Sequence, residues 1–161
     1  MIFDDMEKRT KIIMISAIVA AVGVFGYIQY LSVSDIHISI VQSKVVQTTS
    51  EGTLYNLKIK FQNPSLLFLN VGQTNFAVSA NGESLGTGVM QPSLIPAMGK
   101  VVSQTPFLAN NAVLNKYKDT NNIPSLKMTG TSQYNVLFAT VSIPFTYYPT
   151  QNQAREFIDG V

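Results

Sequence analysis

The feature that most constrains the fold of this chain is an uninterrupted apolar run near its N-terminus. Residues 12–31 contain no charged side chain and a single amide, Gln29. An α-helix of about 20 residues is roughly 30 Å long, which matches the hydrocarbon core of a bilayer. A helix pairs its own backbone groups, and this run lacks the polar stripe of a soluble core helix. The sequence therefore predicts a transmembrane helix over residues 12–31, with the lipid bilayer as its partner.

The charges that flank this run predict its orientation. Lys8, Arg9 and Lys11 precede it, and the next cation along the chain is Lys44. Cationic residues are retained on the cytoplasmic side of a membrane. We therefore expect residues 1–11 to form a cytoplasmic tail of a single-pass protein in the cell membrane, with the C-terminal part outside the cytoplasm.

Two alternatives to a retained anchor remain open at this stage, and the helix itself has a feature that suits a partner helix. Cleavage at the small-x-small triplet Ala21-Val22-Gly23 would make the run a signal peptide. A pilin would also have an apolar N-terminal helix, although pilin processing needs a small residue just before the run, which this chain lacks. Small residues spaced four apart could also let a partner helix approach closely. The two pairs with this spacing are Ser16/Ala20 and Ala17/Ala21.

The rest of the chain shows the period of two that is typical of β-strands. Tyr55, Leu57, Ile59 and Phe61 alternate with polar residues, so we expect one face of this strand to be buried and the other solvated. Similar runs recur about every 8–12 residues between turn signals, among them a short apolar run at residues 66–71 and a strand at 74–80, which the hairpin signal Asn81-Gly82 ends. Pro92 and Pro96 mark an irregular connection. Together these runs predict a β-sandwich. Within this part, residues 109–118 are the only stretch that favours a helix of any length. Residues 148–161 are expected to form a polar tail with at most a helical turn around Ala154–Ile158.

Composition excludes several functional classes. With 12% charged and 46% hydrophobic residues, the chain is not intrinsically disordered. It has no cysteine and one histidine, so thiol chemistry, disulfides and His-rich metal sites are excluded. A net charge of +2 without a Lys/Arg run does not support nucleic-acid binding. We expect no catalytic residues, no metal and no cofactor, and therefore no enzymatic activity.

Two features outside the apolar run allow a second interpretation. His37 belongs to the polar face of the first strand, where it is either a solvated histidine or a proton sensor near the membrane. Phe145 and Tyr147 alternate with Tyr148 on the opposite face of the last strand. These rings either fill the core or form an exposed patch for a partner or a sugar.

A series of short motifs resembles the LEA type 2 family, the WHy (water stress and hypersensitive response) domain of LEA14-like proteins. In chain order the series is Phe61-x-Asn63-Pro64, Asn81-Gly82-x-x-Leu85-x-x-Gly88, Ile95-Pro96-Ala97-x-Gly99, then Gly130 and Pro144. The resemblance covers about residues 33–147. Ser65 stands where the family usually has an asparagine after the Asn-Pro pair.

The resemblance implies both a fold and a role. The implied fold is a seven-stranded, fibronectin-III-like antiparallel β-sandwich with one short helix, spanning residues 33–147. The implied role is a non-enzymatic binding or protective module linked to desiccation or osmotic stress, often membrane-anchored or exported. The alternative is an accessory structural subunit of a membrane complex, with protein partners contacted through the helix or the outer domain. We interpret the motif residues as structural: Asn63, Pro64, Gly82, Leu85, Gly88, Pro96, Gly99, Gly130 and Pro144.

Overall fold

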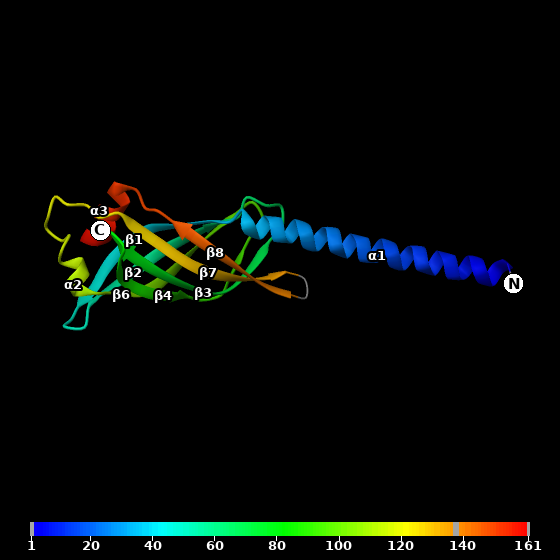
Figure 1. Ribbon diagram of the computed structural model, residues 1–161, viewed down its shortest axis with the longest axis horizontal. Helices are drawn as coiled ribbons and strands as arrows, with labels where there is room; N and C mark the ends of the chain where they lie inside the picture. Colours follow the sequence, from blue (N-terminus) through cyan, green and yellow to red (C-terminus); the bar gives the residue numbers. More distant parts are fainter. Residues whose placement is uncertain (1, 137–138, 161) are drawn as a thin grey trace.

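The chain forms one long helix that extends from one end of a β-rich head (Figure 1). The computed structural model describes residues 2–136 and 139–160. We call the end of the head from which the helix extends the helix-proximal end. The helices are α1 (Ile2–Ser34), α2 (Asn111–Leu114) and α3 (Gln151–Asp159). The strands are β1 (His37–Thr48), β2 (Thr53–Gln62), β3 (Leu69–Ala80), β4 (Glu83–Met90), β5 (Ser93–Ile95), β6 (Lys100–Ala109), β7 (Leu126–Val136) and β8 (Ala139–Tyr147).

The strands form two antiparallel sheets that enclose the core. One sheet has the order β1-β2-β6, and the other has the order β4-β3-β7-β8, with β5 paired to β3. In β2 the alternation predicted from the sequence is confirmed, since Tyr55, Leu57, Ile59 and Phe61 are all buried. The mainly β, two-sheet fold with an N-terminal apolar helix is therefore as predicted.

Aromatic rings from both sheets and from α3 meet in the core. Phe76 of β3 stacks on Phe107 of β6, with 6.0 Å between ring centroids. Phe157 of α3 lies edge-on to Phe107 at 5.8 Å and stacks on Tyr55 at 5.4 Å. Aromatic pairs at these spacings add to the free energy gained by burying the rings. The C-terminal helix is thus part of the same core as the sheets.

The described part of the chain has eight strands instead of the expected seven, because a short connection forms a strand of its own. We expected an irregular segment around Pro92 and Pro96, but residues Ser93–Ile95 form β5, where Ile95 pairs with Leu69 of β3. The segments 66–71 and 74–80, expected as separate elements, largely merge into β3. An irregularity in the pairing with β7 between Val71 and Thr74 remains at their junction. Short-range patterns miss β5 because its pairing partner is distant in sequence.

The structure of the C-terminal segment differs more strongly from the sequence-based prediction. Residues 148–161 were expected to be a polar tail outside the domain, but α3 lies in this segment and buries Ala154, Phe157 and Ile158. The stretch 109–118 contains only the four-residue α2. The sequence predicts only a helical turn around Ala154–Ile158, because the burial of its apolar residues needs a surface made by β1 and β2.

Candidate functional site

The apolar helix α1 is exposed over nearly its whole length. Residues Glu7–Ser34 form a candidate membrane span of 28 residues, and only 6% of its most apolar window is buried inside the protein. A helix of this composition that belonged to a soluble core would be mostly covered by its own chain. Large side chains such as Ile13 and Val19 are instead 68% and 65% exposed. The helix therefore presents an apolar surface that the rest of the described chain does not cover.

The last turns of α1 contact the head. Ser32 and Val33 are buried, with Val33 in the core cluster, and α1 contacts β7 and β8. Further back along the helix, Gly26 and Gln29 are partly covered, and the side-chain oxygen of Gln29 is buried without a hydrogen-bond partner among the described residues. These residues follow a spacing of three to four and so share one helix face. The ends of β7 and β8 extend along α1 toward its N-terminus (Figure 1).

Beside the end of α1, buried Asn63 joins two loops. Its amide nitrogen donates to the carbonyl oxygens of Leu67 (2.7 Å) and Pro96 (3.1 Å), and its backbone N–H donates to Gly99 (2.8 Å). Its side-chain oxygen accepts from the backbone N–H of Ser65. Buried amides with all their groups paired hold loops in one conformation. We call residues 63–68 and 96–99 the loop cluster; it lies at the helix-proximal end, because His37 pairs with Gln62.

Around this buried amide, the loop cluster exposes large apolar side chains. Leu66 is 84% exposed, Phe68 is 64% exposed and Met98 is 67% exposed. Met98 has a positive φ of 51°, and its N–H donates to the carbonyl oxygen of Ser65 at 2.8 Å. A positive φ is unfavourable for a non-glycine residue and persists where the surroundings impose it. The fold therefore holds these side chains outward rather than leaving them in a loose loop.

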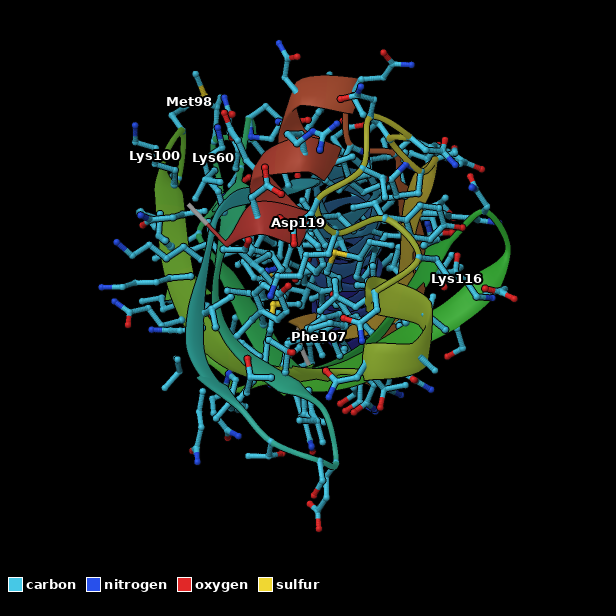
Figure 2. All side chains as sticks on the ribbon, turned by 90° about the vertical axis from the view of Figure 1, so that its left-hand side faces the viewer. Lys60, Met98, Lys100, Phe107, Lys116 and Asp119 are labelled. Atoms are coloured by element: carbon cyan, nitrogen blue, oxygen red, sulfur yellow. The ribbon has the colours of Figure 1, made fainter. Side chains whose placement is uncertain are left out.

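Two lysines flank the loop cluster. Lys60 and Lys100 line an open hollow of about 440 Å³ together with Asn63, Pro64 and Met98. Figure 2 shows Lys60, Lys100 and Met98 on the same side of the head. Lys11 pairs with Glu7 and Lys116 pairs with Glu83, whereas no ion pair of Lys60 or Lys100 is found within the described part of the chain. This end of the head thus combines apolar side chains with unpaired positive charge.

The structure brings four of the motif residues together at the helix-proximal end and places the other five elsewhere in the head. Asn63, Pro64, Pro96 and Gly99 all lie in the loop cluster. The motif series predicts these four residues but not the neighbouring Leu66, Phe68 and Met98 or the two lysines. The sequence pattern places Leu66 and Phe68 in a strand-like apolar run. Their position directly after Asn-Pro-Ser was the signal that could have placed them in a loop.

The remaining motif residues lie within the strands and turns of the head. Gly88 and Gly130 sit on either side of Phe76 in neighbouring strands, and a Cβ at either position would overlap an aromatic ring. Gly82 occupies the β3–β4 turn with φ +85°. Leu85 is fully buried, and Pro144 lies in β8, which is at the edge of its sheet and so tolerates a missing N–H donor.

A second hollow lies between β1 and α3. It has a volume of about 190 Å³ and is lined by Val41, Ser43, Gln153 and Glu156, among others. The pairing of β1 with β2 is irregular between Ile40 and Gln42, which bends the strand at this point. Pockets for small organic ligands usually measure about 300–1,000 Å³. This hollow is therefore smaller than a typical ligand site.

Among the described residues, no group of three or more His, Cys, Asp or Glu side chains could hold a metal ion. His37 is exposed, and its Nδ1 lies 2.8 Å from the carbonyl oxygen of Asp35. Burial, with a smaller contribution from Asp159, raises the pKa of Tyr55 to about 12. Burial also raises the pKa of Tyr134, which keeps both phenols neutral in the core at ordinary pH.

Comparison with known structures identifies the fold of the chain. A solution structure described as a late embryogenesis abundant (LEA) protein is similar over 88% of this chain and 84% of its own length, with a TM-score of 0.53 and 14% identity. A solution structure of an Arabidopsis thaliana protein is similar over 70% of this chain and 78% of its own, with a TM-score of 0.50 and 14% identity. No protein-family model and no curated protein matches the sequence. The head has an LEA2/LEA14-like fold, as the motif series predicted.

Proposed function

We propose that this protein is a membrane-anchored, non-enzymatic module that displays an LEA2-like β-sandwich outside the cytoplasm. The observation that carries the proposal is the direct fusion of an exposed apolar helix to this head. Val33, one residue before the end of α1, is already part of the head's core. The cations Lys8, Arg9 and Lys11 on the N-terminal side favour a cytoplasmic N-terminus. Retention of α1 as an anchor is part of the proposal.

The proposed role is to bind or protect other molecules when water is lost. The LEA-like fold supports this role, because the first comparison structure is described as an LEA protein. The surface is poor in charge, with 12% charged residues in the whole chain. Outward-facing polar side chains such as Asn56 and Gln104, which hydrogen-bond to each other at 3.2 Å, offer neutral donors and acceptors. Such groups can replace water at a drying surface.

Cysteine labelling tests the topology, because the chain has no cysteine of its own. Val46→Cys, at the end of the head far from α1, should react with a membrane-impermeant maleimide in intact cells. Thr10→Cys should react only after lysis. The full-length chain should also stay in the membrane fraction after an alkaline carbonate wash. Release of a shortened chain by that wash would show that α1 is a cleaved signal peptide, and labelling of the two positions in the opposite order would invert the topology.

Gene deletion tests the protective role separately. A deletion strain should survive drying or osmotic shock less well than its parent, and the wild-type gene should restore survival. Equal survival of the two strains in both treatments would remove the stress role and leave the topology unaffected.

The exposed small residues on α1 favour a second candidate function, as an accessory subunit of a membrane complex. Ser16, Ala17, Ala20 and Ala21 all lie on the uncovered part of the helix. Small residues allow close helix–helix approach in a bilayer. Solubilisation in mild detergent followed by native electrophoresis distinguishes the two functions. Migration as a single chain would eliminate the subunit role.

A further inference from the structure

We propose that the head is partly embedded in the outer leaflet, with the loop cluster at the depth of the lipid headgroups. In this arrangement Leu66, Phe68 and Met98 contact the upper acyl chains, and Lys60 and Lys100 contact lipid phosphates. The inference deepens the proposed function and rests on it, because it takes α1 as the membrane span.

The first argument is the overlap between the head and the apolar run of α1. Partial covering begins at Gly26, whereas the apolar run continues to Leu31. At about 1.5 Å per residue, the head lies beside roughly 8 Å of that run. The uncovered apolar part, residues 12–25, is only about 21 Å long, shorter than a hydrocarbon core of about 30 Å. A helix that spans the core therefore brings the ends of β7 and β8 into the outer leaflet.

The second argument is the exposure of the loop cluster at this same end. Phe68 is 64% exposed and Leu66 is 84% exposed, although each is large and apolar. Contiguous apolar side chains that the fold holds outward mark a contact surface. Because the loop cluster begins one residue after Gln62, which pairs with His37 just beyond α1, it lies beside the point where α1 would leave the membrane. As the membrane span, α1 holds these side chains next to the bilayer, so the bilayer is the surface that they contact.

The third argument is charge. Lys60 and Lys100 flank the apolar side chains, and long cationic side chains extend from apolar surroundings to reach phosphates. Cationic residues next to a span also favour anionic lipid. Asp35, in the connection after α1, lies at this end as well and reduces the net positive charge. The expected preference for anionic headgroups is therefore moderate, and apolar contact carries most of the interaction.

Single tryptophans can test this depth, because the chain has no tryptophan. The full chain is reconstituted into phosphatidylcholine vesicles containing phosphatidylglycerol, with or without bromine on the upper acyl chains. Phe68→Trp reports on the loop cluster, Phe25→Trp on α1, and Val46→Trp on the far end of the head, where Val46 is 60% exposed. We expect brominated lipid to quench Phe68→Trp and Phe25→Trp at least twofold and to leave Val46→Trp unchanged.

The three reporters separate the failure of this inference from the failure of the anchor. Quenching of Phe25→Trp without quenching of Phe68→Trp would show an inserted helix with a head above the bilayer, which overturns the inference alone. Absence of quenching at Phe25→Trp would overturn the anchor and the inference together. Equal quenching of Val46→Trp and Phe68→Trp would indicate non-specific adsorption of the head, which also overturns the inference.

A charge variant tests the lysines. In the Phe68→Trp background, Lys60→Gln with Lys100→Gln should reduce the extra quenching that anionic lipid produces. Lys127→Gln, an exposed lysine at the start of β7 and far from α1, is the matched control and should leave this effect unchanged. An identical response of the double variant and the control would overturn the assignment of Lys60 and Lys100 to lipid phosphates.

Discussion

At the scale of single residues, the buried Asn63 holds the two loops of the helix-proximal end together. It is 1% exposed, and it pairs both its side-chain oxygen and its side-chain nitrogen within the loop cluster. Proline at position 64 then ends the strand, because it lacks an N–H donor. The exposed positions of Leu66 and Met98 therefore depend on one buried amide.

Asn63→Ala should destabilise the head by about 2–4 kcal/mol, because it leaves the carbonyl oxygens of Leu67 and Pro96 and the N–H of Ser65 without their partners. Chemical denaturation followed by circular dichroism measures this loss. Asn56→Ala is the matched control, since its amide makes one exposed hydrogen bond to Gln104. If Asn63→Ala loses only about 0.5 kcal/mol of stability, as expected for the control, the structural role of this amide is contradicted.

At the scale of elements, α3 closes the far end of the sandwich. Thr150 and Gln153 form a capping box at its start, and Gly160 ends it in the left-handed conformation with φ +72°. Ser43 of β1 donates to the carbonyl oxygen of Phe157 at 3.0 Å, and Tyr55 of β2 donates to that of Ile158 at 3.0 Å. Strand side chains thus satisfy carbonyl groups that the helix end leaves unpaired.

Phe157→Ala should cost about 3–5 kcal/mol, because it removes a buried ring that packs on Tyr55 and Phe107. Thermal and chemical denaturation of the variant measure the loss. Glu156→Ala, the neighbouring exposed position on the same helix, should change stability by less than about 0.5 kcal/mol. Equal stability of the two variants would mean that α3 is a tail and not part of the core.

At the scale of the whole molecule, the buried phenols link stability to alkaline pH. The pKa of Tyr55 is raised to about 12 in the folded protein, mainly by burial and then by Asp159. The unfolded chain should release this proton near the ordinary tyrosine pKa of about 10. Between these values the folded state holds more protons than the unfolded state, so the free energy of unfolding falls as pH rises. The pKa of Tyr134 is raised by burial in the same direction.

The contribution of Tyr55 to the free energy of unfolding should therefore not change with pH below about pH 10. From pH 10 to 12 it should decline by up to about 1.4 kcal/mol per pH unit. Urea denaturation at pH 9, 10 and 11 measures the slope. Tyr55→Phe should make the slope shallower and, by losing the hydrogen bond to Ile158, should cost about 1 kcal/mol at pH 7. Tyr148→Phe, at a residue that is 64% exposed, should leave the slope unchanged. If the slope is the same in Tyr55→Phe, groups other than Tyr55 cause the loss of stability at alkaline pH.

The elements whose signals are local can be predicted from the sequence alone. The apolar run predicted the helix, and the period of two in residues 55–61 predicted the inward face of β2. The turn at Asn81-Gly82 was readable because both residues tolerate positive φ, and both adopt it. The motif series predicted the LEA2-like fold, which the comparisons support.

The features that depend on distant partners become visible only in the folded chain. Strand β5 forms because Ile95 pairs with Leu69, which is distant in the sequence. Helix α3 belongs to the core because β1 and β2 offer it a surface. The exposure of Leu66 and Phe68 at the helix-proximal end also depends on distant partners. Their apolar run looks like a strand in the sequence, but the hydrogen bonds of Asn63 hold it as a loop. Periodicity records which residues are apolar, whereas their burial or exposure is set by the elements that fold against them.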